Sequence, residues 1–207
     1  MRRKNNISKY VKKLCLKKKW RHTIREVDLL LHGDADDILV DQTWIPLRDS
    51  LRAGEWDTLV VTPPCSDFSR VKWANSKGPK PTRSRQHPRG FPWLKGRLRN
   101  STDKANELVD KSIEACKEGH ASSARTSWLA EHPEDLGDTP QGGCPASIWQ
   151  WESMHELIKS HDAVQGAPHQ GVHPEALSSK PTRLAGTVRS IAKLLALGPP
   201  KFNKDMQ

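Results

Sequence analysis

The sequence WDTLVVTPPCSDFSR, residues 56–70, contains the strongest strand signal in the chain. Residues 56–62 carry β-branched and apolar side chains on both faces, which is typical of a parallel strand buried between layers of helices. This signal ends at Pro63-Pro64-Cys65, so a thiol follows the predicted strand directly. In open α/β sheets, ligands bind at the carboxyl ends of the strands, which makes this position a candidate site.

The segments on either side of this strand alternate between strand and helix signals. We predict a strand at 24–31, a helix at 43–53, a loop at 70–100, a helix at 102–118 capped by Ser101 or Thr102, a strand at 126–130, a helix at 146–159, and at 182–197 either a helix or a strand followed by a helix. This order predicts an α/β fold with a mostly parallel sheet, flanking helices and a long loop.

The composition predicts one folded domain with two flanking segments. Its 207 residues are enough for a single domain, which we place at 23–200 between a flexible basic arm at 1–22 and a tail at 201–207. No apolar run approaches the roughly 18 residues that cross a bilayer, so we expect no membrane partner. Four cysteines without a disulfide or metal spacing favour a reducing, intracellular setting, which would be nuclear in a eukaryote.

The charge of the chain is segregated. Residues 1–25 and 68–102 together hold 21 of the 34 basic residues, and all 24 acidic residues lie elsewhere. Two basic strips on an acidic body predict a polyanionic partner. For residues 1–25, a solvated tail is an equally good interpretation, and a nuclear-import patch is another. For residues 68–102 we favour nucleic acid, because this strip follows Cys65 directly.

Two reactive side chains lie at the ends of predicted strands. Cys65 follows one strand and Glu131 follows the other. Positive charge nearby favours the thiolate form of a cysteine, and a neighbouring carboxyl group can act as an acid or bind a heterocycle. The alternative is that Cys65 is a small buried hydrophobic residue and Glu131 a surface acid.

The residues around Cys65 resemble the catalytic motif of the C5-cytosine DNA methyltransferases, a strand followed by Pro-Cys, a polar residue and Phe-Ser. Glu131-His132-Pro133 resembles a variant of that family's Glu-Asn-Val motif. The resemblance covers about residues 26–187 and is greatest to divergent viral and retroelement-type members. The shared features are Pro63-Pro64-Cys65, Gly78-Pro79-Lys80-Pro81, Pro88-Arg89-Gly90-Phe91-Pro92-Trp93, Glu131 to Gly137, Pro145 to Trp149 and Lys180-Pro181-Thr182-Arg183.

This resemblance implies a partial Rossmann-like methyltransferase fold over residues 23–200, with a catalytic loop at 65–100. It implies transfer of a methyl group from S-adenosylmethionine to a flipped cytosine in DNA. Cys65 would be the nucleophile, Glu131 would hold N3 of the base, and Arg183 is similar to the arginine of a later motif. The residues that would hold DNA are Arg70, Lys72, Arg83, Arg85 and Arg89.

The cofactor side of the resemblance is less complete. The family's first motif, Phe-x-Gly-x-Gly, has no counterpart before residue 26, so we expect a truncated N-terminus, or a partner chain that supplies this segment. Asp28 is similar to the residue that binds the cofactor ribose, and Asp36 or Asp37 to the residue near its adenine. Pro63 would pack near the cofactor.

Other signals are weaker. His169, His173 and Cys144 give a possible zinc spacing, but no second ligand pair accompanies them, and we expect no metal. Trp73 and Trp93 in the basic loop either stack on bases or pack the loop down. Two further function classes therefore stand beside the methyltransferase. One is a non-catalytic nucleic-acid-binding remnant, and the other is a basic interaction protein in which Pro-Pro-Cys is a coincidence.

Overall fold

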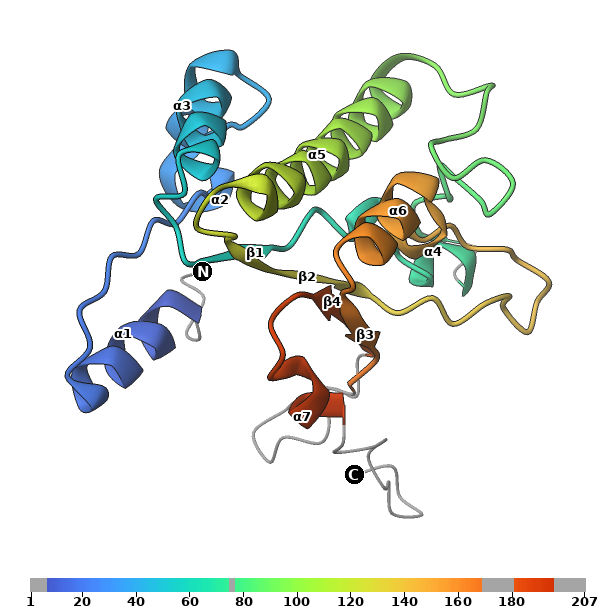
Figure 1. The fold of residues 1–207 in the computed structure, drawn as a ribbon. Coiled ribbons are helices and arrows are strands. Elements are labelled where there is room, and N and C mark those ends of the chain that lie inside the picture. Colours follow the sequence, from blue (N-terminus) through green and yellow to red (C-terminus); the bar gives the residue numbers. More distant parts are fainter. Residues whose placement is uncertain (1–6, 75–76, 169–180, 196–207) are drawn as a thin grey trace.

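The structure is a computed structural model, and it describes residues 7–74, 77–168 and 181–195 (Figure 1). The tail predicted at 201–207 and the first six residues of the basic arm lie outside these ranges. The rest of the arm contains α1, and the extended segment after it leads to α2. The helices are α1 (Ile7–Lys18), α2 (Leu29–His32), α3 (Asp41–Arg52), α4 (Val71–Ala74), α5 (Gly96–Ala121), α6 (Glu152–Ser160) and α7 (Ile191–Leu195), with 3-10 turns η1 (Gly33–Asp36), η2 (Ser66–Phe68) and η3 (Ile148–Gln150).

The described strands form one four-stranded sheet in the order β1-β2-β4-β3. They are β1 (Thr58–Val61), β2 (Ser127–Pro133), β3 (Val164–Gly166) and β4 (Thr182–Gly186). β1 and β2 are parallel, whereas β4 runs antiparallel to both β2 and β3. The fold is therefore mixed α/β, and the prediction of a mostly parallel sheet is wrong. The apolar pattern of 182–186 identifies a strand but carries no information on its direction.

The predicted strand at 24–31 is also wrong. Its first half is extended but joins no sheet among the described residues, and Leu29 begins the short helix α2. The physical reason is that Arg25, Glu26 and Asp28 leave only Ile24 and Val27 as apolar side chains in this extended half, which is too little apolar surface to bury in a sheet.

The other predicted helices and strands are confirmed, with shifted ends, whereas the loop predicted at 70–100 contains the short helix α4 and the first residues of α5. The strands at 56–62 and 126–130 are β1 and β2, and the segment at 182–197 is a strand followed by a helix. The helix at 102–118 is confirmed as α5, but it begins at Gly96, so Ser101 and Thr102 lie inside it and Lys95 occupies the cap position. The helix predicted at 146–159 is divided into the turn η3 and α6.

The main core lies where α5 and α6 pack against the sheet (Figure 1). Val109 of α5, Trp128 of β2 and Leu157 of α6 are completely buried there. Burial of one such side chain contributes about 1.5–3 kcal/mol. A second cluster, formed by Trp44, Leu51 and Ala115, joins α3 to α5. Together these contacts hold the β1–α5–β2 unit, in which the helix connects two parallel strands.

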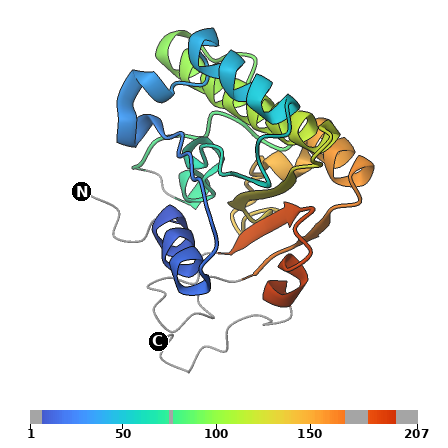
Figure 2. The same cartoon turned by 60° about the vertical axis from the view of Figure 1, so that its left-hand side comes forward.

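β1 lies at one end of the described sheet rather than between helix layers on both faces. Leu59 and Val61 pack against the core, but Thr58 is exposed and Val60 is 41% exposed. The expectation that this strand is buried on both faces is therefore wrong. α1 stands apart from α3 and α5 (Figure 2). In the described part of the chain, no helix combines the length and the apolar character that a membrane span requires.

Candidate functional site

Cys65 and Glu131 lie at the same edge of the sheet. In the parallel pair, Val61 of β1 lies opposite Ala130 of β2. Glu131 is the next residue of β2, and Cys65 follows Val61 by four residues. Both therefore lie at the carboxyl edge of the parallel strands, where α/β proteins commonly bind ligands.

The turn that carries Cys65 is fixed to the end of β2. The backbone N–H of Phe68 donates to the carbonyl oxygen of Cys65 at 3.1 Å, which closes the turn η2. Phe68 is buried, and its ring meets that of His132 edge-on with 5.0 Å between centroids. The thiol of Cys65 is free and half-buried. The position of Cys65 relative to β2 is thus set by the packing of Phe68, three residues later, against His132.

Glu131 presents an accessible carboxylate. Successive side chains of a strand point to opposite faces, so Glu131 lies on the face of β2 opposite Ala130 and His132, which are buried. Its side chain is half-buried and makes no hydrogen bond or ion pair to any residue that the structure describes. The carboxylate can therefore hydrogen-bond to a ligand that approaches this face.

Arg183 is not brought to Glu131. In the antiparallel pair it lies opposite His132, so its side chain is on the other face of the sheet. There its guanidinium donates to both carboxylate oxygens of Glu134, with Nε 3.0 Å from each, and lies 5.6 Å from the ring centre of Trp149. This paired arginine stabilises the join between β4 and the segment after β2.

Arg83 lies inside the protein, with only 1% of its surface exposed. Its guanidinium donates to the Asn106 side chain at 2.8 Å and to the Pro88 carbonyl at 3.0 Å, lies 3.5 Å from the Asp67 carboxylate, and stacks 4.0 Å from the Phe68 ring centre. Burial lowers the pKa of Arg83, and the nearby Asp67 opposes this effect. Arg83 therefore joins the basic loop to α5 and the Cys65 turn, and it is not part of an exposed DNA-binding surface.

Two further basic residues are also engaged within the chain. Arg70 donates to the backbone carbonyls of Gly137 and Asp138, the second at 2.6 Å, and so links the segments that follow β1 and β2. Lys72 forms a half-buried ion pair of 3.0 Å with Asp67. These contacts organise the carboxyl edge, and they leave fewer free cations there than the sequence suggests.

Arg85 and Arg89 are exposed, but each has an acidic partner. Arg85 lies 3.2 Å from Asp138. Arg89 forms a bidentate pair with Asp110 of α5 and lies 4.2 Å from the ring centre of Trp151. The Asp110 hydrogen bonds raise the pKa of Arg89 above its usual value. The other exposed cations of the loop and of the start of α5 are Lys77, Lys80, Lys95, Arg97 and Arg99.

The three predicted cofactor carboxylates lie in one turn. The Asp28 N–H donates to Asp36 at 2.9 Å, His32 contacts the same Asp36 oxygen, and the Leu39 N–H donates to Asp37 at 3.0 Å. Burial opposes the charged form of Asp36, but these hydrogen bonds outweigh it and lower its pKa. The contacts of Asp36 and Asp37 close their own turn.

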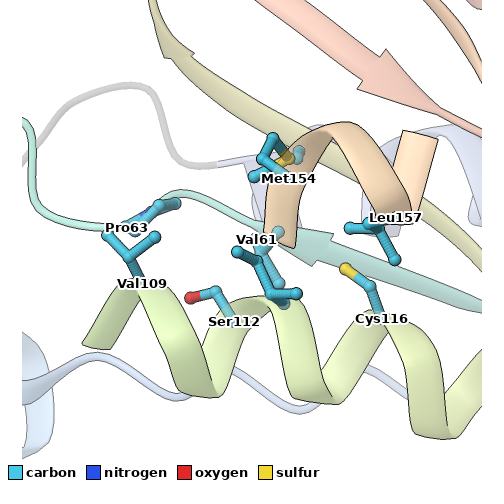
Figure 3. A pocket seen from close by; sticks show the side chains of 9 residues that line it. Val61, Pro63, Val109, Ser112, Cys116, Met154 and Leu157 are labelled. Atoms are coloured by element: carbon cyan, nitrogen blue, oxygen red, sulfur yellow. The ribbon is translucent and has the colours of Figure 1, made fainter. Parts of the chain in front are cut away.

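Pro63 lines a small cavity between β1, α5 and α6 (Figure 3). The other walls are apolar apart from Ser112, and Figure 3 shows Val109, Cys116 and Met154 around the same space. Its volume of about 10 Å³ is the size of one water molecule. This cavity is too small for S-adenosylmethionine, and hydrogen bonds of the turn occupy one oxygen each of Asp36 and Asp37.

The sequence interpretation missed the aromatic and polar groups that position the edge. Phe68, Asp67 and Asn106 hold Arg83, and the first two follow Pro-Pro-Cys within the segment 56–70. An acid and an aromatic ring beside a run of cations are a usable signal for a structural arginine. A stacked pair of His120 and His161, 4.0 Å apart, was also missed, and no sequence pattern indicates it.

Within residues 7–74, 77–168 and 181–195, no group of three or more His, Cys, Asp or Glu side chains is placed to hold a metal ion. His169 and His173 of the possible zinc spacing lie outside those ranges. Comparison with protein-family models, with curated proteins and with solved structures gives no match for this chain.

Proposed function

We propose that this chain is a C5-cytosine methyltransferase-like protein that binds DNA and handles a cytosine at the carboxyl edge of β1 and β2. One observation carries the proposal. A free, half-buried thiol and an unengaged carboxylate lie at the same edge of a parallel strand pair, beside a basic loop. The resemblance of the Cys65 and Glu131 motifs to that family gives the same reaction.

The two side chains have complementary roles in activating cytosine. The Cys65 thiolate donates an electron pair to C6 of the base, and a bond forms between sulfur and C6 as the C5–C6 double bond is lost. Glu131, in its protonated form, gives its proton to N3, so the adduct is neutral and C5 becomes nucleophilic. The nucleophilic C5 then takes up a proton from water, which is a deuteron in heavy water. A base removes the original proton of C5, the C5–C6 double bond re-forms as the bond between sulfur and C6 breaks, and the thiolate is regenerated. N3 returns its proton to Glu131, so cytosine is restored.

The residues expected to hold the methyl donor are less well suited to their role than Cys65 and Glu131 are. S-adenosylmethionine would supply an electrophilic methyl group, but Asp36 and Asp37 are engaged in their own turn and the cavity at Pro63 is too small. We therefore assign the cofactor-binding segment to a partner chain.

The activation step is testable without a methyl donor, because a nucleophilic C5 exchanges its hydrogen with solvent. We expect the chain to catalyse deuterium exchange at C5 of cytosine in DNA, and Cys65→Ser to abolish it. Cys144→Ser is the matched control, since Cys144 is also free and half-buried but follows Gly143 in a turn rather than following β1. Exchange that survives in Cys65→Ser contradicts the assignment of the nucleophile.

A second candidate function is a nucleic-acid-binding protein without catalysis. The engaged carboxylates of Asp36 and Asp37 favour it, because their hydrogen bonds within their own turn compete with a cofactor for the same oxygens. DNA binding that is salt-dependent, together with no exchange at C5 in the wild type, supports this candidate over the first.

A further inference from the structure

The basic loop carries an aromatic platform. The rings of Phe91 and Trp93 are stacked, with 4.6 Å between centroids and 9° between planes. The ring of His87 meets both edge-on, at 5.9 Å and 5.7 Å. Phe91 and His87 are half-buried, whereas Trp93 is 64% exposed. The outer ring of the stack is therefore open to a ligand.

The platform has a rigid base. The Phe91 N–H donates to the Thr82 carbonyl at 2.9 Å, and the Gly90 N–H donates to the His87 carbonyl at 3.0 Å. Gly90 has a φ of +117° and lies against Thr102 of α5, so any side chain there would meet the helix. A rigid site loses little conformational entropy on binding, which favours affinity.

Two cations follow the exposed ring closely in the sequence. Lys95 and Arg97 lie two and four residues after Trp93, and both are exposed without a partner among the described residues. No acidic residue occurs between 68 and 102. An exposed indole within an acid-free basic segment is complementary to nucleic acid, where bases stack on aromatic rings and cations contact phosphates.

Trp73, the other candidate for base stacking, is placed differently. It is half-buried and packs against Gly143, where even a single added carbon would meet its ring. Trp73 therefore holds the loop down, and of these two candidates only Trp93 presents an open ring.

We propose that Trp93, supported by Phe91, stacks on an unpaired base of a single-stranded nucleic acid, while Lys95 and Arg97 contact its phosphates. This inference rests on the nucleic-acid partner of the proposed function, and it specifies single-stranded or unpaired regions. Stacking on an aromatic side chain contributes about 1–3 kcal/mol per base, equivalent to about 5-fold to 150-fold in affinity.

The experiment compares Trp93→Ala with Trp20→Ala by fluorescence anisotropy. Trp20 is the matched control, because it is 61% exposed and lies in the other basic segment. The probes are labelled oligothymidine and oligouridine of about 12 nucleotides, and a DNA duplex of mixed sequence. We expect Trp93→Ala to weaken single-strand binding at least 5-fold, with duplex binding unchanged and with Trp93→Phe restoring most of the affinity.

The outcomes separate this inference from the proposed function. If the wild type and Trp93→Ala bind single strands with equal affinity, the proposed stacking on Trp93 is overturned, and the nucleic-acid partner stays in place. An equal loss on duplex and single strands also overturns it, because stacking requires an unpaired base. A wild type that binds none of the probes overturns both proposals. The two single-stranded probes show whether the base comes from DNA or RNA.

Discussion

Replacing Arg83 by methionine tests whether this residue is structural. Methionine keeps an unbranched apolar stem against Phe68 but removes the guanidinium. Three hydrogen bonds are lost, to Asn106 at 2.8 Å, to the Pro88 carbonyl at 3.0 Å and to the Thr102 carbonyl at 3.4 Å. The 3.5 Å contact to Asp67 is lost with them. Asp67 keeps its ion pair with Lys72, so it is not left as an isolated charge.

The magnitude follows from the burial of these groups. A hydrogen bond from a charged donor contributes about 1.5–3 kcal/mol, and breaking a buried pair costs about 3–5 kcal/mol. The three bonds share one guanidinium and are not additive, so we expect a loss of about 3 kcal/mol in the free energy of unfolding. For a chain of this length that corresponds to a decrease in Tm of about 6–12 °C.

Arg85→Met is the matched control. Arg85 lies two residues away, but its pair with Asp138 is exposed, and such pairs contribute about 0–1 kcal/mol. Urea unfolding of the wild type and both variants, followed by circular dichroism, measures the difference. A loss below about 1 kcal/mol in Arg83→Met, or an equal loss in both variants, refutes the structural role of Arg83.

Three further predictions concern other parts of the molecule. Burial, with repulsion from His120 and Lys117, lowers the pKa of His161 to about 4, whereas the pKa of this group in the unfolded chain is near 6.5. The free energy of unfolding is therefore highest above about pH 6.5 and falls by about 1–2 kcal/mol toward pH 4. Urea unfolding measured across this pH range should show a weaker pH dependence in His161→Gln. Gly186→Ala places a carbon against the backbone of Trp128 and should lower the free energy of unfolding by about 2–3 kcal/mol. A loss below about 1 kcal/mol would mean that β4 can move away from β2 at this position without cost. Replacing Lys95 and Arg97 together by glutamine should reduce the salt slope of DNA binding by about 2, and an unchanged slope would remove both from the phosphate contacts.

The sequence predicts the individual elements well where hydrophobic periodicity is strong. β1, β2 and α5 are found near their predicted positions because each buries a regular apolar face, as Val109 of α5 does. The direction of β4 was not predictable in this way, because strand direction depends on the path of the chain between strands. The strand predicted at 24–31 failed for a local reason, because its charged residues leave too little apolar surface for a sheet, and the structure shows no sheet partner for it among the described residues.

The candidate site shows a similar division. Cys65 and Glu131 were predicted at one edge from their places after two strands, and the parallel pairing of β1 and β2 confirms that placement. The face on which Arg183 lies was not predictable, because it depends on its register opposite His132. Register across a sheet is set by contacts between distant segments, and local composition carries little information on it.

The basic loop illustrates why a count of charges overstates a binding surface. Of its ten cations, Arg70, Lys72 and Arg83 are turned toward backbone carbonyls, a carboxylate and an aromatic ring of the same chain. Such groups release no counterions when a nucleic acid binds. Ten phosphate contacts would give a salt slope of about −9, whereas the seven exposed cations give about −6 at most. The same three side chains hold the Cys65 turn, the loop and the end of β2 together. Part of the positive charge that suggests a polyanionic partner is therefore used within the chain, where it fixes the edge of the sheet at which a base would be held.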